Sequence, residues 1–477
     1  MSGFVGVPVR TFLKRFRAGL GIAAIFGAAT ALAAATIPNL FPFLDSTGAM
    51  ETYTPAGSLV ESGAFFQSLG TNGRTCVSCH VIGNAMGLSA AHAERVYERT
   101  DGQDPLFAAV DGAVCPTAAP GQALDFSLLR HNGLIRIGLQ LPANLQFTIT
   151  PVHDPYGCAL VTDPVTGAQT ASVYRRPLPG TNLGFLTAVM WDGRETGMPL
   201  NNAATFSANL IADLKHQASD ATTGHAQAST APTDAQLTQM VNFELSLNSA
   251  QAVDFAAGDL SKDGADGGPL FLTQVPFFPG INDAFGANGV TFDPHVFTLY
   301  SKWLYSGNPD RRSIARGEEI FNTQPLTIQN VRGLPNMAGT CTTCHDTPNV
   351  GDHSLAVPLE IGTSRTVNYE TDPTVQAAVS QLSMPDLPVF QIACTHGADA
   401  GQVTYTSDPG KALLTGLCTD VGRGKGLILR GLAARAPYFH NGSAATLDEV
   451  VNFYNVRFQM NLTPQEKRDL VNFLQTL

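Results

Sequence analysis

The chain contains two copies of a five-residue pattern in which two cysteines flank two other residues and a histidine follows. The copies are Cys76 to His80 (CVSCH) and Cys341 to His345 (CTTCH). At this spacing two thiols can add to the vinyl groups of one haem while the adjacent imidazole binds its iron. A zinc site would instead pair one Cys-x-x-Cys with a second one nearby. The sequence therefore predicts two covalent c-type haems, with the following residues as thioether and iron ligands: Cys76, Cys79, Cys341, Cys344, His80 and His345.

Four further cysteines lie outside these motifs, two in each half of the chain: Cys115, Cys158, Cys394 and Cys418. Because their number is even, an oxidising compartment permits disulfides, including Cys115–Cys158 and Cys394–Cys418 within each half. The sequence alone leaves all three pairings open.

The first residues are basic, and a long apolar run follows. No charged residue stands between Arg17 and Asp45, and residues 18–37 are dominated by alanine and other apolar types. This pattern is typical of a secretory signal, and the alternative is a retained membrane anchor, because the run is long for a signal core. Export to the periplasm suits covalent haem, which is assembled outside the cytoplasm. The formal charge of −11 argues against a nucleic acid partner and favours a basic or neutral protein.

A chain of 477 residues is too long for one compact core. With 46 Gly, 30 Pro and only 14% charged residues, we expect short helices, long loops and few short strands. The predicted fold class is mainly α, with two cytochrome c-like domains. The expected order is a signal or anchor (1–36), a peroxidatic haem domain (37–250), a linker (251–309) and an electron-transfer haem domain (310–477).

Local patterns predict several elements. Capping boxes that begin at Thr233, Thr446 and Thr463 each predict a helix start. Residues 58–69 are predicted to form an amphipathic helix before the first motif, and the alternation over 134–141 indicates a strand.

Tyr454 falls on the apolar face of the helix that begins after Thr446, together with Leu447, Val450 and Val451. On its own, a tyrosine in this position is more often part of the core than an iron ligand.

Two longer motifs make the chain similar to a known family. Residues 436–442 (APYFHNG), followed by 446–454 (TLDEVVNFY), resemble the C-terminal haem domain of the bacterial di-haem cytochrome c peroxidase superfamily. Residues 191–194 (WDGR) match an element of that superfamily's N-terminal domain. The resemblance covers about residues 59–477.

This resemblance implies roles for two aromatic residues. Tyr454 takes the position of the distal ligand of the C-terminal haem, which is methionine in conventional peroxidases and tyrosine in the MauG branch, so the chain resembles that branch. Met460 and His440 are alternative ligands. Trp191 corresponds to the tryptophan that passes electrons between the haems, although a buried aromatic anchor is its common structural role.

The first haem should be left open to oxidant, and a group must then move a proton between the peroxide oxygens. Residues 214–218 (LKHQA) resemble the element that places a glutamine, which here is Gln217. Where relatives have a glutamate, this chain has His225 nearby, which suits proton transfer but is equally well explained as a surface histidine. His92 is an alternative group that would cap the iron at rest.

The resemblance predicts an oxidoreductase that reduces hydrogen peroxide at the first haem and shares high-valent iron with the second, served by a redox protein donor or a protein substrate. The alternatives are a dioxygenase of the rubber-oxygenase type, which would take dioxygen, and an electron-transfer cytochrome without catalysis. The resemblance makes a calcium ion between the domains possible, but Arg435 stands where relatives have a threonine, so the sequence itself does not support one.

Overall fold

The structure is a computed structural model that describes residues 35–116 and 123–477. The predicted signal or anchor therefore lies outside the described residues, except for its last two positions. No helix within the described ranges is both long enough and apolar enough to cross a membrane. Residues Thr36–Leu477 form one unit by their contacts.

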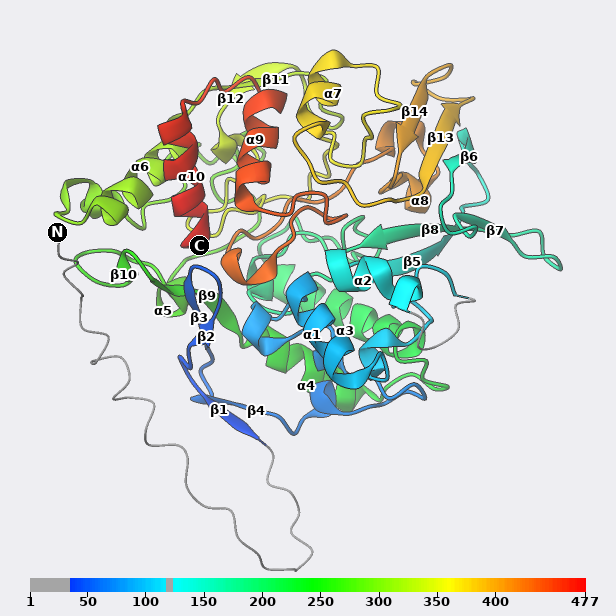
Figure 1. Cartoon of the computed structure of the whole chain (residues 1–477), viewed down its shortest axis with the longest axis horizontal. Coiled ribbons are helices and arrows are strands. Elements are labelled where there is room, and N and C mark those ends of the chain that lie inside the picture. The colour runs from blue at the N-terminus through cyan, green and yellow to red at the C-terminus, as the bar shows by residue number, and fades with distance from the viewer. Residues whose placement is uncertain (1–34, 117–122) are drawn as a thin grey trace, which may run out of the picture. The chain divides into compact units, whose positions relative to one another are not determined.

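Helices from both halves of the chain surround the two cysteine motifs. In the first half the helices are α1 (Ala90–Thr100), α2 (Ser127–Asn132), α3 (Phe206–Gly224) and α4 (Asp234–Leu245). In the second half the longer helices are α6 (Pro309–Thr323), α7 (Pro373–Val379), α9 (Leu447–Arg457) and α10 (Pro464–Gln475). Two single-turn helices complete the set, α5 (Pro269–Leu272) and α8 (Ala412–Thr415). Helix α10 packs along α6 and against α9, and α7 packs on the far side of α9 (Figure 1).

The predicted helix starts are confirmed at all three sites, but the full capping box forms only at Thr233 and Thr463, because the Glu449 carboxylate accepts from Ser383 and Ala445 instead. Thr233, Thr446 and Thr463 each accept a hydrogen bond from the backbone N–H three residues on, at the starts of α4, α9 and α10. Such a bond satisfies one of the backbone donors that have no partner within the first turn.

The predicted mainly α fold class is wrong. Helices take up only 30% of the structure and strands 16%, in several small sheets. Three of these sheets have three or four strands, in the orders β10-β9-β3-β2, β5-β8-β7 and β14-β13-β6, and β1-β4 and β11-β12 are pairs. The segments expected to be loops satisfy their backbone hydrogen bonds by pairing with one another instead.

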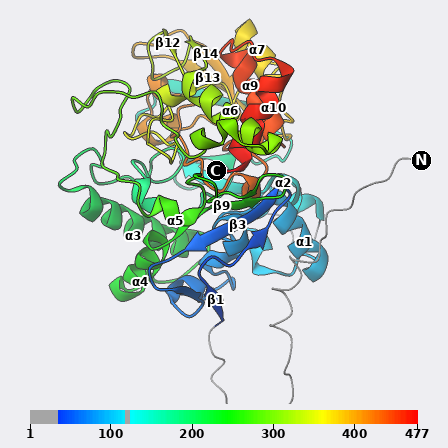
Figure 2. The same cartoon turned by 90° about the vertical axis from the view of Figure 1, so that its left-hand side faces the viewer.

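The strands of the largest sheet are β2 (Phe43–Leu44), β3 (Gly48–Tyr53), β9 (Asn248–Asp254) and β10 (Gly258–Asp259), of which β3 and β9 lie side by side (Figure 2). The second sheet contains β5 (Ile135–Gln140), β7 (Leu160–Thr162) and β8 (Gln169–Arg175), which confirms the predicted strand over 134–141.

The predicted helix over residues 58–69 is also wrong. Ser58–Val60 is strand β4, which pairs with β1 (Thr36–Pro38), and only Ala64–Phe66 forms a short 3₁₀ turn. Pairing with a distant strand overrides the local helical pattern here. The remaining pair joins β11 (Leu326–Ile328) to β12 (Met337–Gly339) just before the second cysteine motif.

The two halves share a sheet. Strand β6 (Phe147–His153) pairs antiparallel with β13 (Val389–Cys394), which also pairs with β14 (Val403–Thr406) (Figure 1). A core cluster of the first half accordingly includes Phe390 and Ile392 of β13. The predicted domain boundaries at 250 and 310 stay a prediction.

Candidate functional site

Both cysteine motifs fold into the same turn. Cys76–Ser78 and Cys341–Thr343 are 3₁₀ turns, each preceded by a threonine with a capping-box partner at the third turn residue. The backbone N–H of His80 donates to Cys76 O at 2.9 Å, and that of His345 donates to Cys341 O at 3.1 Å. All four motif cysteines are free thiols. Burial raises their pKa values to about 11 or 12, so they stay protonated at neutral pH.

The histidine of each motif is oriented by a backbone carbonyl six residues further on. His80 Nδ1 donates to Met86 O at 3.2 Å, and His345 Nδ1 donates to Gly351 O at 2.6 Å. Burial lowers the pKa of both imidazoles and favours the neutral form. With Nδ1 carrying the proton, Nε2 is left with its lone pair, as an iron ligand requires.

The first motif opens on a cavity that contains both predicted peroxidatic residues. Gln217 on α3 and His225, directly after α3, line this cavity together with Cys76, Cys79 and His80. No described residue hydrogen-bonds to the Gln217 side-chain amide. His92 lies on α1 and is not part of the lining.

His225 is held by a buried ion pair that no motif in the sequence predicts. Its Nδ1 donates to one oxygen of Asp111, and Arg74 donates to the other. Asp111 and Arg74 are both almost fully buried, at 4% and 3% exposed. Although burial opposes ionisation, Arg74 and His225 together hold the pKa of Asp111 below its usual value. The ionised carboxylate therefore fixes the His225 tautomer and leaves Nε2 free at the cavity.

A buried glutamate lies close to His80. A methyl group placed on Gly180 would lie 2.8 Å from Glu244 Oε1 and 3.3 Å from His80 Nδ1. Burial raises the pKa of Glu244 to about 8, so this carboxyl is mostly protonated at neutral pH. Glu244 is on α4, on the side of the cavity where His80 meets its carbonyl partner.

The second motif opens on a larger cavity with mainly apolar walls. It is lined by the following predicted residues: Cys341, Cys344, His345, Tyr454, Met460, His440 and Trp191. Tyr454 is on α9, and burial raises the pKa of its phenol, with the nearby thiols Cys344 and Cys341 adding to the rise. No described residue hydrogen-bonds to the Tyr454 hydroxyl. The phenol oxygen is therefore free to meet a ligand in the cavity.

The two other candidate ligands of this cavity differ from Tyr454. Burial lowers the pKa of His440 to about 4, and its Nε2 lies 3.7 Å from Asp408 Oδ2. Met460 is buried at 3% exposed and packs in the core around α10. Tyr454, His440 and Met460 all border the cavity, so its lining alone does not choose among them.

Trp191 stands where the two cavities come close. Its Nε1 donates to Arg176 O at 2.7 Å, and its ring lies edge-on to His440 at 5.8 Å. Trp191 lines the second cavity, whereas its neighbour Met190 lines the first. Residues 177–179, Lys425, Leu427 and Arg435 line both. The cavities therefore share a wall.

Buried cations surround this shared wall. The guanidinium of Arg176 donates to the carbonyl oxygens of Asn132, Leu88 and Arg435, and that of Arg435 donates to those of Gly431, Ile428 and Arg430. Lys425 Nζ donates to Ala188 O at 2.9 Å. None of these three cations forms an ion pair within the described ranges. Burial lowers their pKa values, to about 9, 10 and 8 respectively.

This chemistry fits haem c at both motifs. Each motif offers two free thiols and an imidazole with Nε2 available, beside a cavity whose walls are mostly apolar. Unpaired buried cations at the shared wall are the partners that haem propionates need. The arginine that replaces the calcium-region threonine, Arg435, is one of them.

Comparison with known proteins gives two significant relatives. Two proteins of Denitromonas iodatirespirans, the cytochrome-c peroxidases IdrP2 and IdrP1, are both 28% identical to this chain. The matches run over 221 and 166 residues, or 43% and 32% of the chain. The chain resembles cytochrome c peroxidases. The predicted resemblance to cytochrome c peroxidases is thereby confirmed.

The match to these peroxidases is partial. It spans 54% of IdrP2 and 41% of IdrP1, about half of each relative. No family model matches the chain. Among solved structures, a MauG-like protein associated with microbial copper homeostasis aligns over 67% of this chain and 79% of its own, at 17% identity. The TM-score of 0.28 is too low to relate the two folds.

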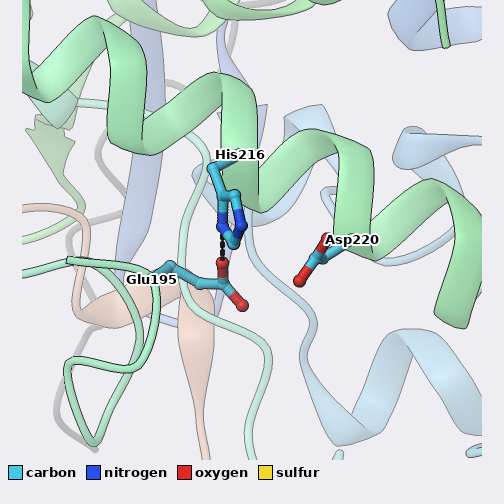
Figure 3. Close-up of side chains that lie close together, drawn as sticks. All are labelled: Glu195, His216 and Asp220. Atoms are coloured by element: carbon cyan, nitrogen blue, oxygen red, sulfur yellow. Dashed lines mark hydrogen bonds and ion pairs between the residues drawn. The ribbon is translucent and has the colours of Figure 1, made fainter. Parts of the chain in front are cut away.

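The LKHQA segment that resembles the peroxidase superfamily also carries an exposed cluster. His216 Nδ1 donates to Glu195 Oε2 at 2.7 Å, with Asp220 one turn further along α3 (Figure 3). This hydrogen bond raises the pKa of His216. His216 is two-thirds exposed and faces away from the cavity lining, whereas Gln217 belongs to it.

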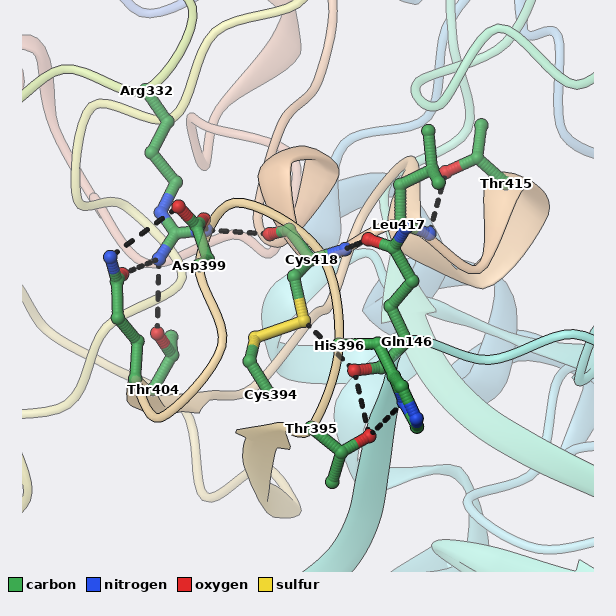
Figure 4. The surroundings of a disulfide bond; sticks show 11 residues. Gln146, Arg332, Cys394, Thr395, His396, Asp399, Thr404, Thr415, Leu417 and Cys418 are labelled. Atoms are coloured by element: carbon green, nitrogen blue, oxygen red, sulfur yellow. Dashed lines mark hydrogen bonds and ion pairs between the residues drawn. A yellow bond between two sulfur atoms is a disulfide. The ribbon is translucent and has the colours of Figure 1, made fainter.

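The structure contains the two disulfides that stay within each half, Cys115–Cys158 and Cys394–Cys418. The second bridge ties the end of β13 to the segment that begins at Cys418, where Arg332 donates to Cys418 O and pairs with Asp399 (Figure 4). The free thiols are thus the four cysteines of the two motifs.

Several functional candidates were missed by sequence reasoning. Asp111 is far from His225 in the chain and belongs to no motif. Glu244 lies within a helix that was predicted correctly, but the pattern gave no sign that its carboxyl lies near His80, on the other side of Gly180. The one available signal was Arg435, whose departure from the superfamily pattern marked a change in local charge.

Proposed function

We propose that the chain is an exported, periplasmic di-haem c oxidoreductase that reduces hydrogen peroxide at the first motif. The observation that supports this most is that the two cysteine motifs fold into the same kind of turn but open on cavities with different polar side chains. The first cavity contains a free amide and an anchored imidazole, whereas the second contains a free phenol. Its electrons would come from a small redox protein or from side chains of a protein substrate.

Peroxide reduction consumes two electrons and two protons and releases two water molecules. Bound haem would supply the iron that receives electrons from the reductant and delivers them to the peroxide. The protein must then hold the peroxide and move a proton from its near oxygen to its far oxygen. We assign this transfer to His225 Nε2, because Asp111 fixes the proton on Nδ1. Gln217 would donate a hydrogen bond that holds the peroxide in place.

A haem at the second motif would store oxidising equivalents. Tyr454 and His345 would hold the iron of this haem, and an anionic oxygen donor would favour the oxidised metal more than a thioether would. Trp191 would carry electrons through the shared wall, since its ring borders the second cavity while Met190 borders the first.

The sharpest test is the exchange of His225 for glutamine, with His216→Gln, in the middle of α3, as the matched control. We expect His225→Gln to slow the reaction with peroxide by about a hundredfold or more, measured by stopped-flow absorbance, and His216→Gln to leave it unchanged. Equal rates in both variants would remove His225 from the proposal.

Two results with the wild-type protein would overturn the peroxidase proposal. Stable binding of dioxygen with no reaction toward peroxide would favour the dioxygenase. Two haems that ignore both peroxide and small ligands would favour the electron carrier.

A further inference from the structure

Three buried side chains from two distant segments converge beside the second cysteine motif. Asp346 directly follows His345, and His353 comes seven residues later in the same loop. Asp283 belongs to a separate loop between α5 and α6. Their exposed fractions are 0%, 4% and 1%, respectively. One potential ligand atom from each residue lies within 4.8 Å of the other two.

The local backbone holds each carboxylate by one oxygen and leaves the other free. Asp346 Oδ1 accepts from the N–H of Ser354 at 2.6 Å, and Asp283 Oδ2 accepts from the N–H of Ala287 at 2.8 Å. Asp346 Oδ2, Asp283 Oδ1 and both ring nitrogens of His353 are buried without a hydrogen-bond partner among the described residues. Buried polar atoms in native proteins are nearly always paired, so four such atoms in one place indicate a missing partner.

The spacing of two of these atoms indicates what that partner is. His353 Nδ1 and Asp346 Oδ2 are 2.9 Å apart, a distance that would make an ion pair if the imidazole were protonated, yet they do not form a hydrogen bond. Two ligands about 2.0–2.2 Å from one metal ion are themselves roughly 3–3.5 Å apart, with both lone pairs directed at the ion rather than at each other.

We propose that Asp283, Asp346 and His353 bind a divalent transition metal ion, with Zn²⁺ as the best match. Imidazole together with carboxylates suits zinc and its neighbours in the first transition row. Calcium would need six to eight oxygen ligands. The site shares no residue with the predicted haem ligands, although His353 also lines the second cavity.

The ion would act as a clamp. It would join the loop that contains Asp283 to the loop 346–354, and this second loop supplies the Gly351 carbonyl that orients His345. Thr187 of the first half also donates to His353 O, at 3.0 Å. Loss of the ion should therefore loosen the support of His345 without removing any ligand of the haem iron.

The exposed cluster in Figure 3 provides an internal contrast. Glu195, His216 and Asp220 meet the same distance criterion, but Glu195 is already hydrogen-bonded to His216, and His216 and Asp220 face solvent. These residues have no buried atom that lacks a partner. We therefore assign no metal to this cluster and use it as the control.

The experiment uses the full chain matured with haem. The protein is treated with a chelator, loaded with ZnCl₂ and freed of excess ion, and zinc and iron are then counted by mass spectrometry. We expect one zinc per chain in the wild type and in Asp220→Asn. We expect Asp283→Asn to bind zinc at least about tenfold more weakly, because one anionic ligand is lost. A wild type that keeps no zinc, or an Asp283→Asn variant that binds it as tightly, would overturn the site.

A second measurement needs no variant and covers the case in which Asp283→Asn does not fold. X-ray absorption at the zinc edge of the wild type should show nitrogen and oxygen ligands at about 2.0–2.1 Å with imidazole scattering. Sulfur ligands near 2.3 Å would mean that zinc has bound free cysteines, and the proposal would fail. Neither readout depends on peroxidase activity.

Discussion

The two cysteine motifs fold into the same kind of turn but border cavities whose opposite walls differ. In both, the histidine donates through Nδ1 to a carbonyl six residues on, so the proximal side is built in the same way twice. Across the first cavity stand Gln217 and the His225–Asp111 pair, whereas Tyr454 borders the second. On the proposed function, the short motif would determine what is bound, and distant segments would determine how it reacts.

The largest expected effect is on the number of bound haems, when the two cysteines of one motif are replaced at a time. Replacing Cys341 and Cys344 by alanine should leave one haem per chain, and replacing Cys76 and Cys79 should do the same. Intact mass and pyridine haemochrome spectra measure the count. Two haems in either variant would mean that the thiols are not the attachment points.

The next largest effect is on the reduction potential of the second haem, which should depend on Tyr454. Tyr454→Phe keeps the ring and removes the phenol oxygen, so the reduction potential of the second haem should rise and its ferric spin state should change. Tyr438→Phe is the matched control, since this tyrosine borders the same cavity but donates to Leu432 O. Spectroelectrochemical titration measures the reduction potentials of both variants. An identical response from the two would show that Tyr454 is not a ligand.

A third prediction concerns the contribution of the buried ion pairs of Arg175 to stability. Arg175 is buried between Asp192, next to Trp191, and Asp408, which borders the second cavity. Asp408→Asn should lower the free energy of unfolding by roughly 3 kcal/mol or more, because it removes one charge of a buried network. Denaturant unfolding measures the loss. A change below about 1 kcal/mol would contradict the role of this network.

The same network predicts a pH dependence. Against the effect of burial, Arg175 lowers the pKa of Asp192 from 3.8 to about 2 and also lowers that of Asp408. Because both pKa values are depressed in the folded state, their contribution is complete above about pH 4 and is lost as the pH falls toward 2. Acid unfolding of Asp408→Asn should therefore be less steep over this interval than that of the wild type.

The smallest effect concerns the link between the cavities. Trp191→Phe keeps an aromatic ring but leaves Arg176 O without its donor, which should cost about 1 kcal/mol. Electron transfer between the two haems should slow in pulse-radiolysis traces, while the haem count stays at two. Unchanged transfer would reduce Trp191 to a packing residue.

Local features of the site were readable from the sequence. The cysteine motifs and the caps at Thr233, Thr446 and Thr463 depend on residues three or four positions apart, and the structure bears out the caps. The pairing of β6 with β13 depends on segments from opposite halves, which no local pattern connects.

The sequence also did not show which charged side chains are buried. Nothing in the spacing of Arg176, Lys425 and Arg435 distinguishes them from surface cations, yet all three line the cavities. Asp111 meets His225, and Asp283 meets Asp346, only because the chain returns to the same place after many residues. The mainly α prediction failed for the same reason, since short strands gain their partners from tertiary structure.

We propose that one haem is open to ligands and that Tyr454 closes the other. Low-temperature EPR of the fully oxidised wild-type chain tests it most directly. We predict a high-spin, five-coordinate signal beside a low-spin signal of histidine and tyrosinate ligation, with the low-spin signal lost in Tyr454→Phe. Two low-spin signals in the wild type, or a low-spin signal that survives in Tyr454→Phe, would contradict the account.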